Sequence, residues 1–117
     1  MLRLSDETHI FVASKPVDFR KAITGLSMLV VEQFSKSLMD GSVYVFYNRE
    51  RDKVKCLFWE KNGFVLYHKR LERGKFKFSI QPGEHYPINS KQLDWLFAGL
   101  DFMLMQDFEM LDYTHYF

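Results

Sequence analysis

The sequence predicts an α+β domain in which an antiparallel meander of four to five strands packs against two main helices. Two changes in hydrophobic period predict this class. Apolar residues first recur at helical spacing, then alternate with polar residues through the middle of the chain, and return to helical spacing after residue 89. Short polar loops separate the alternating segments, which favours antiparallel pairing of consecutive strands.

The first third of the chain predicts one strand and one helix. Residues 9–13 form a short apolar run that closes before Pro16. The helix that follows is expected to end near residues 35–37, and Asp40-Gly41 then turns the chain. Its apolar face is formed by residues that recur at spacings of three and four, namely Phe19, Ala22, Ile23, Leu26, Leu29, Val30 and Phe34.

From Ser42 onwards the period is two, which predicts strands. Asn62-Gly63 is the strongest hairpin signal, because a type I′ turn needs positive φ at both central residues. Residues 49–52 and 72–74 are the other expected turns. The four predicted strands cover residues 43–48, 53–60, 64–71 and 75–80.

The turn at Asn62-Gly63 predicts which side chains share a face of the central hairpin. Trp59 would lie opposite Leu66, and Lys55 opposite Arg70. One face then mixes cations with a tryptophan and carries Lys53, Lys55, Leu57, Trp59, Leu66, His68 and Arg70. The other face is more apolar and is expected to meet the helices; it carries Val54, Cys56, Phe58, Val65, Tyr67, Lys69 and Leu71.

The last third of the chain predicts a second helix and an extension. Asn89 is a suitable N-cap, with Gln92 three residues later to complete a capping box. The apolar positions of this helix are Leu93, Leu96, Phe97 and Leu100. We expect one α+β domain over residues 1–102, followed by an apolar extension, residues 103–117. Because a solvated tail is rarely so apolar, the extension either packs on its own domain or covers a partner.

Charge is unevenly distributed along the chain. The formal net charge is only +1, yet residues 49–77 hold ten basic and four acidic residues, a net charge of +6. Clustered cations of this kind favour a polyanionic partner. No apolar run is long enough to span a membrane, and no signal peptide is evident at the N-terminus. The single cysteine, Cys56, excludes an internal disulfide and fits a reducing cytoplasm.

The sequence gives no positive case for an enzyme or a cofactor. The four histidines are scattered without metal-ligand spacing. Asp18 suits the first turn of a helix, and Asp94 and Asp101 fall on the polar side of a short one, so a magnesium site is not indicated. Gly-rich phosphate loops and nucleophile elbows are also missing from the sequence.

Several runs resemble one family in order and at matching spacing over residues 8–102. They are Val17-Asp18-Phe19-Arg20-Lys21, Gly25-Leu26, Val45-Phe46-Tyr47-Asn48-Arg49, Lys53-Val54-Lys55-Cys56-Leu57-Phe58-Trp59, Asn62-Gly63, Lys69-Arg70-Leu71-Glu72-Arg73-Gly74-Lys75-Phe76, Gln92-Leu93 and Gly99-Leu100-Asp101. The chain resembles TnpB, the small accessory protein of the insertion-sequence-66 transposon family. Members of that family often end soon after the last helix or in a short basic tail, whereas this chain continues with an apolar, acidic extension.

The resemblance implies a bacterial accessory protein of transposition that acts beside a separate transposase, with no catalytic residues to map. Together with the charge pattern, it gives a leading hypothesis: the protein binds DNA, such as the transposon ends, through the sheet face that mixes cations with Trp59, and does not cut it. Cations would neutralise phosphates and Trp59 would stack on bases. The candidate residues are Arg20, Lys21, Arg49, Arg51, Lys53, Lys55, Trp59, Lys69, Arg70, Arg73, Lys75 and Lys77.

Three alternatives remain open from the sequence. The basic surface and the extension could dock on the transposase or on a second copy of the chain. The charges of the mixed sheet face could merely keep it soluble, and Arg20 and Lys21 could pair with acids elsewhere. Arg70 and Arg73 could also be structural, with Arg73 pairing with Glu72 or Asp52 to hold the turn.

Overall fold

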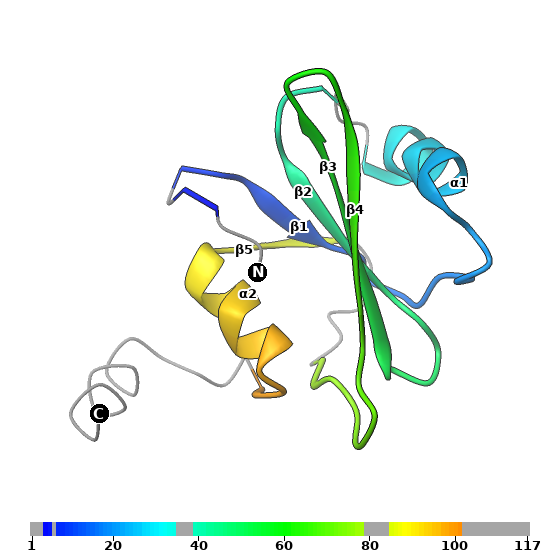
Figure 1. Cartoon of the computed structure of the whole chain (residues 1–117), viewed down its shortest axis with the longest axis vertical. Helices are drawn as coiled ribbons and strands as arrows, with labels where there is room; N and C mark the ends of the chain where they lie inside the picture. Colours follow the sequence, from blue (N-terminus) through cyan, green and yellow to red (C-terminus); the bar gives the residue numbers. More distant parts are fainter. Residues whose placement is uncertain (1–3, 6, 35–38, 79–84, 102–117) are drawn as a thin grey trace.

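A five-stranded sheet with a helix on each side forms the protein, as the computed structural model shows for residues 4–5, 7–34, 39–78 and 85–101 (Figure 1). The predicted α+β class is therefore confirmed. The strands are β1 (Ile10–Val12), β2 (Val43–Tyr47), β3 (Lys53–Glu60), β4 (Gly63–Arg70) and β5 (Tyr86–Ile88). The helical elements are α1 (Ile23–Leu29), a π-helical continuation η1 (Val30–Phe34) and α2 (Ser90–Phe97).

The strand order is β4-β3-β2-β1-β5, and most neighbouring strands are antiparallel. The meander β2-β3-β4 is the part that the alternation predicted. β1 pairs with β2 in parallel, because the chain crosses over through α1 between them. The sequence did not reveal β5, which is three residues long and contains Pro87. Proline donates no ladder hydrogen bond and is confined to sheet edges, where β5 lies.

The predicted hairpin register is wrong by two positions. Glu60 lies opposite Gly63 and Trp59 opposite Phe64, so the two loop residues are Lys61 and Asn62. Lys61 takes the positive φ, 52°, and Gly63 enters the strand. Because the slip is an even number of residues, the same side chains share each face as predicted.

The first helix is shorter than predicted and begins at Ile23 instead of near Phe19. The Asp18 carboxylate accepts the backbone N–H of Arg20 at 2.9 Å, a local bond that competes with helix formation. The carbonyls of Phe19 and Lys21 accept hydrogen bonds from the Lys55 ammonium. We call residues 16–22 the β1–α1 loop. The predicted end at residues 35–37 lies outside the described residues.

The fourth predicted strand, over residues 75–80, is wrong for its described part. Lys75 to Phe78 pair with no strand, and Ser79 and Ile80 lie outside the described residues. The alternation in this segment instead reflects burial, because Phe76 and Phe78 are buried while the lysines between and before them are exposed. Phe78 stacks on Tyr47 of β2 with ring centroids 4.1 Å apart.

Both faces of the sheet are covered, which corrects the expectation that the helices meet only the more apolar face. α2 packs on that face, where the rings of Tyr67 and Phe97 lie 5.1 Å apart. The β1–α1 loop and α1 cover the mixed face (Figure 1). The capping box of α2 is confirmed, since Asn89 and Gln92 exchange two hydrogen bonds of 2.8 Å. The extension, residues 103–117, lies outside the described residues.

Candidate nucleic-acid interface

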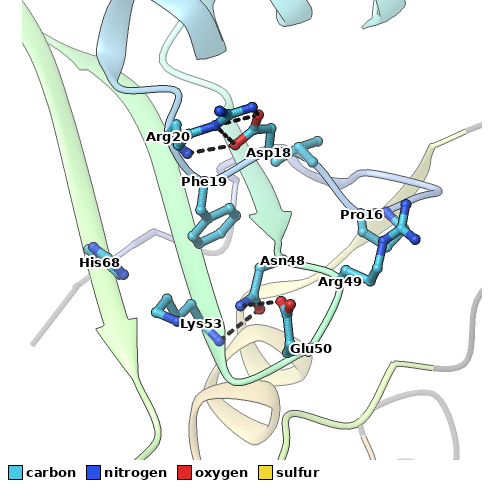
Figure 2. Close-up of a pocket in the computed structure, with 10 residues that line it drawn as sticks. Pro16, Asp18, Phe19, Arg20, Asn48, Arg49, Glu50, Lys53 and His68 are labelled. Carbon is cyan, nitrogen blue, oxygen red and sulfur yellow. Dashed lines mark hydrogen bonds and ion pairs between the residues drawn. The ribbon is translucent and has the colours of Figure 1, made fainter.

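A cleft of about 640 Å³ opens where the β1–α1 loop meets the β2–β3 hairpin and β4 (Figure 2). Three segments that are far apart in sequence form its walls. Their lining residues are Pro16, Val17, Asp18, Phe19 and Arg20 from the loop, Asn48, Arg49, Glu50 and Lys53 from the hairpin, and His68 from β4. We call this hollow the polar cleft.

Lys55 supports the polar cleft from beneath. The residue is 7% exposed, and its ammonium donates to the carbonyls of Phe19 at 3.0 Å and Lys21 at 2.8 Å. The ammonium also lies 4.7 Å from the centre of the Phe19 ring, which is a cation–π contact. Burial lowers the pKa of Lys55. Because its donors are used inside the protein, Lys55 fixes the loop and is not part of the cleft surface.

Two rings meet inside the polar cleft. The rings of Phe19 and His68 are 5.9 Å apart and nearly perpendicular, at 79°. Figure 2 shows Phe19 directed from the loop into the space between His68 and Asn48. Desolvation lowers the pKa of His68 below 6.5, and the nearby cations Lys55, Lys53 and Arg70 lower it further. The imidazole is therefore mostly neutral at pH 7 and presents an aromatic surface.

Asn48 holds the hairpin wall in shape. Its amide nitrogen donates to Asp52 at 2.6 Å and to Glu50 at 3.2 Å, and its amide oxygen accepts the backbone N–H of Lys53 at 3.0 Å. Asn48 is also buried, and Arg51 in the same loop takes a positive φ of 61°. The loop conformation is thus specified by one side chain that satisfies its neighbours.

Cations line the rim of the polar cleft in different states of pairing. Two guanidinium nitrogens of Arg20 donate to the Asp18 carboxylate, with Nη2 2.6 Å from Oδ2. This ion pair lowers the pKa of Asp18 to about 2. Lys53 lies 3.5 Å from Asp52. Arg49 is exposed and makes no hydrogen bond or ion pair with any described residue. These contacts are at the surface, where ion pairs contribute little and exchange readily.

The run Lys69 to Phe76 ties the hairpin loop to the end of β4. The Leu71 N–H donates to the Asp52 carbonyl at 2.8 Å, and the Lys75 ammonium donates to the Glu50 carbonyl at 2.9 Å. The Phe76 N–H donates to the Arg51 carbonyl at 2.7 Å. Much of this run therefore serves the fold and keeps the hairpin beside β4.

The two arginines of this run differ. Arg70 pairs with Glu72 at 3.0 Å, and both side chains are exposed. Arg73 is exposed and has no ion pair or hydrogen bond within the described part of the chain. The alternative that Arg73 pairs with Glu72 or Asp52 is therefore wrong for the described residues. The Glu72 carboxylate pairs with Arg70, and the Asp52 carboxylate accepts hydrogen bonds from Asn48 and Lys53.

The remaining candidate residues lie away from the polar cleft or face the fold. Lys69 donates to the Phe97 carbonyl at 2.7 Å on the opposite face of the sheet. Trp59 is half-buried beside Phe64, with ring centroids 5.1 Å apart, near the other end of the hairpin. Lys21, Lys77 and Arg51 complete the set; the first two are exposed and the third is half-buried.

Sequence reasoning does not single out Phe19, His68 and Asn48 as a group. Its patterns place Phe19 on a helix face and Asn48 at a strand end. One signal is present in the sequence: an asparagine at the start of a short polar turn, as at Asn48, is typical of a loop that a side chain stabilises.

A second hollow, of about 450 Å³, runs beside α1 and is almost entirely apolar. Met28 is 58% exposed and Val31 is 57% exposed on its border. We call it the apolar groove, and it is lined by Ile23, Thr24, Ser27, Met28, Val31, Glu32 and Phe64.

No three His, Cys, Asp or Glu side chains among the described residues gather in a way that could hold a metal ion. Cys56 is buried, and burial raises the pKa of its thiol. No described helix combines the length and apolarity needed to cross a bilayer.

Comparison with known proteins places this chain in a family. The family described as IS66 Orf2 like protein matches residues 8–107. Two proteins of Sinorhizobium fredii are similar, and both are named only as uncharacterized. The first, y4jC, is 34% identical over 86% of each chain, and the second, y4hO, is 28% identical over 92% of this chain and 93% of its own. No solved structure matches. The chain therefore belongs to the IS66 Orf2-like family of transposition accessory proteins.

Proposed function

We propose that this protein assists IS66 transposition by binding DNA, such as the transposon ends, without catalysing strand chemistry itself. One observation carries the proposal: cations from three distant segments gather around the polar cleft. Arg20 comes from the β1–α1 loop, Arg49 and Lys53 from the hairpin, and Arg70, which lies opposite Lys53, from β4. Phosphates favour such clusters because each neutralised charge releases condensed counterions.

The pairing of the cations decides which of them are available to phosphate. Arg49, Arg73 and Lys77 are exposed and have no described partner. Arg20 and Arg70 have exposed acid partners, which a phosphate can replace at small cost. Lys55 and Lys69 donate to backbone carbonyls and belong to the fold, and Trp59 lies at the other end of the hairpin. Four further cations either lie at the periphery or already use part of their hydrogen-bond donors; they are Lys21, Arg51, Lys53 and Lys75.

The test is fluorescence anisotropy with a labelled duplex of the element's end, measured over a salt series. Each phosphate contact is expected to add about −0.9 to the slope of log K against log salt. The double variant Arg49→Ala/Arg73→Ala should therefore bind more weakly and reduce the steepness of the slope by about 1.8. The matched control, Lys61→Ala/Lys91→Ala, removes two exposed cations far from the cleft and should change neither quantity.

Two results would overturn this proposal. One is the absence of binding at low salt. The other is a slope that Arg49→Ala/Arg73→Ala leaves unchanged although circular dichroism shows the variant folded.

A second candidate function is protein contact, and the apolar groove favours it. Exposed apolar side chains gathered around a hollow are typical of interaction sites. We infer that its occupant is an apolar segment of the separate transposase, because accessory proteins of this family act in the same transposition machinery. The rival occupants are the extension, residues 103–117, and a second copy of the chain.

Co-purification with the transposase after nuclease treatment tests this candidate. Val31→Glu places a charge in the groove and should abolish the contact, whereas Met39→Glu changes a similarly exposed apolar residue that does not line it. Removing residues 103–117 tests the extension as anchor, and light scattering of the isolated protein tests self-association. Contact that survives Val31→Glu would contradict the assignment to the groove.

A further inference from the structure

We propose that the polar cleft is a pocket for one unpaired nucleotide, whose base lies against Phe19 and His68 and whose phosphate lies at Arg49. This inference rests on the proposed function and names the form of DNA that the site selects. It differs from contact with a duplex, in which the bases are stacked inside and only the backbone reaches a basic surface.

The size of the cleft fits one nucleotide and excludes a duplex. A volume of about 640 Å³ is within the range of small-molecule sites. A base can enter such a hollow only when it is unstacked, as in a single strand, a bulge or a flipped nucleotide. A duplex would lie across the rim and leave the interior of the cleft unfilled.

The rings inside the cleft offer the surface that a base requires. Phe19 is half-buried, and His68 is exposed and mostly neutral at pH 7. Aromatic side chains bind unpaired bases by stacking, which tolerates any base because each has a π face. In this chain the two rings belong to segments 49 residues apart, so their meeting is a property of the folded cleft.

The charges separate the two parts of the nucleotide. Asp18 and Glu50 line the cleft together with Arg20, Arg49 and Lys53. Arg20 neutralises Asp18, but the carboxylate of Glu50 keeps phosphate away from its side of the cleft. The most favourable arrangement therefore places phosphate at Arg49, which has no partner among the described residues, and the uncharged base inside.

The walls of the cleft are held by bonds that need no ligand. Lys55 fixes the carbonyls of Phe19 and Lys21, and Asn48 fixes the hairpin from within. A pocket that is already formed loses little conformational entropy on binding. A single base can thus contribute a measurable gain in affinity.

The experiment compares three labelled probes of one sequence: a perfect duplex, the same duplex with one extra unpaired nucleotide, and the single strand. The wild-type protein should bind the bulged duplex about tenfold more tightly than the perfect duplex, as stacking of one base allows. With 2-aminopurine as the unpaired base, its fluorescence should fall on binding. Phe19→Leu and His68→Ala should each bring the affinity ratio near one and leave the affinity for the perfect duplex within about twofold.

Phe11→Leu is the matched control, because Phe11 is a half-buried phenylalanine on β1 that does not line this cleft. It should keep both the affinity ratio and the fluorescence change. Equal affinity of the wild type for bulged and perfect duplexes would overturn this inference while the proposed function stands. Preference for the bulge that persists in both cleft variants would also overturn it, and failure to bind any probe would overturn inference and function together.

Discussion

The polar cleft and the apolar groove lie over the same face of β3 and β4, yet their chemistry differs. At one end of this face His68 meets the β1–α1 loop, and at the other end Phe64 meets α1. The side chains of one strand therefore serve two surfaces. The difference is made by the segment that covers each end of the face.

That covering segment changes character at Ile23, where the helix begins. Before it, backbone carbonyls have no helical partner and must be satisfied by other groups, and Lys55 supplies two of the bonds. After it, α1 satisfies its own backbone and presents only side chains such as Met28. A loop thus creates a polar surface and a helix an apolar one over a single strand face.

The largest expected effect comes from removing the support of the loop. Lys55→Ala deletes two hydrogen bonds from a charged donor and leaves two carbonyls without them. We expect the free energy of unfolding to fall by about 3 kcal/mol, because such bonds contribute about 1.5–3 kcal/mol each and water replaces part of them. Urea denaturation measures the loss. Lys53→Ala is the control on the same strand face; it removes a half-exposed ion pair and should cost under about 1 kcal/mol.

A similar loss in both lysine variants would contradict the structural role of Lys55. The same pair of variants also bears on the cleft itself. If Lys55 holds the β1–α1 loop, a folded Lys55→Ala protein should lose the preference for an unpaired base, while the apolar groove, built on α1, keeps its binding partner.

A smaller effect is expected at the hairpin wall of the polar cleft. Asn48→Ala removes one acceptor and two donor contacts within the loop. Because Asn48 is buried and its partners lie at the surface, where water can reach them, we expect a loss of about 2 kcal/mol in the free energy of unfolding. Thermal unfolding followed by circular dichroism measures it. Asn62→Ala, in the other hairpin loop, should cost less than half as much, and an equal loss would show that Asn48 has no special role.

The fold can be predicted from the sequence as far as local signals reach. The alternation over residues 53–60 predicts β3 with its bounds, and Asn89 with Gln92 predicts the cap of α2, because both signals act within a few residues. The predicted pairing of residues across the β3–β4 turn is wrong by two positions. Lys61 adopts a positive φ here, and no pattern in the sequence indicates which two residues of Lys61-Asn62-Gly63 form the loop.

The candidate site is harder to predict, because it is assembled from long-range contacts. Composition alone identifies the cations, but their availability depends on partners up to 36 residues away, as for Lys55 and Phe19. The spacing of Phe19 itself predicts a helix. A buried lysine that binds loop carbonyls overrides that spacing, and no pattern within the loop reveals it.

Two glycines, one at each end of β4, allow the two ends of the β3–β4 hairpin to be compared. Gly74 follows β4 at the cleft end with a φ of +77°, whereas Gly63 begins β4 at the groove end without positive φ, and a Cβ added to either would meet no atom within 4 Å. Gly74→Ala should lower the free energy of unfolding by about 1 kcal/mol, since alanine is strained in the left-handed region. Gly63→Ala should change it by less than about 0.5 kcal/mol. Equal values in urea denaturation would contradict the turn conformation at Gly74.

The smallest expected effect concerns whether the apolar groove is free. Met28 is 58% exposed on its border, so Met28→Gln should change the free energy of unfolding by less than about 0.5 kcal/mol in the isolated chain. A loss above about 1 kcal/mol would instead mean that the chain covers the groove itself, because only a covered methionine loses that much apolar burial. Removing residues 103–117 then identifies the cover: if the extension occupies the groove, the cost of Met28→Gln disappears in the shortened chain, and the transposase is left without this docking site.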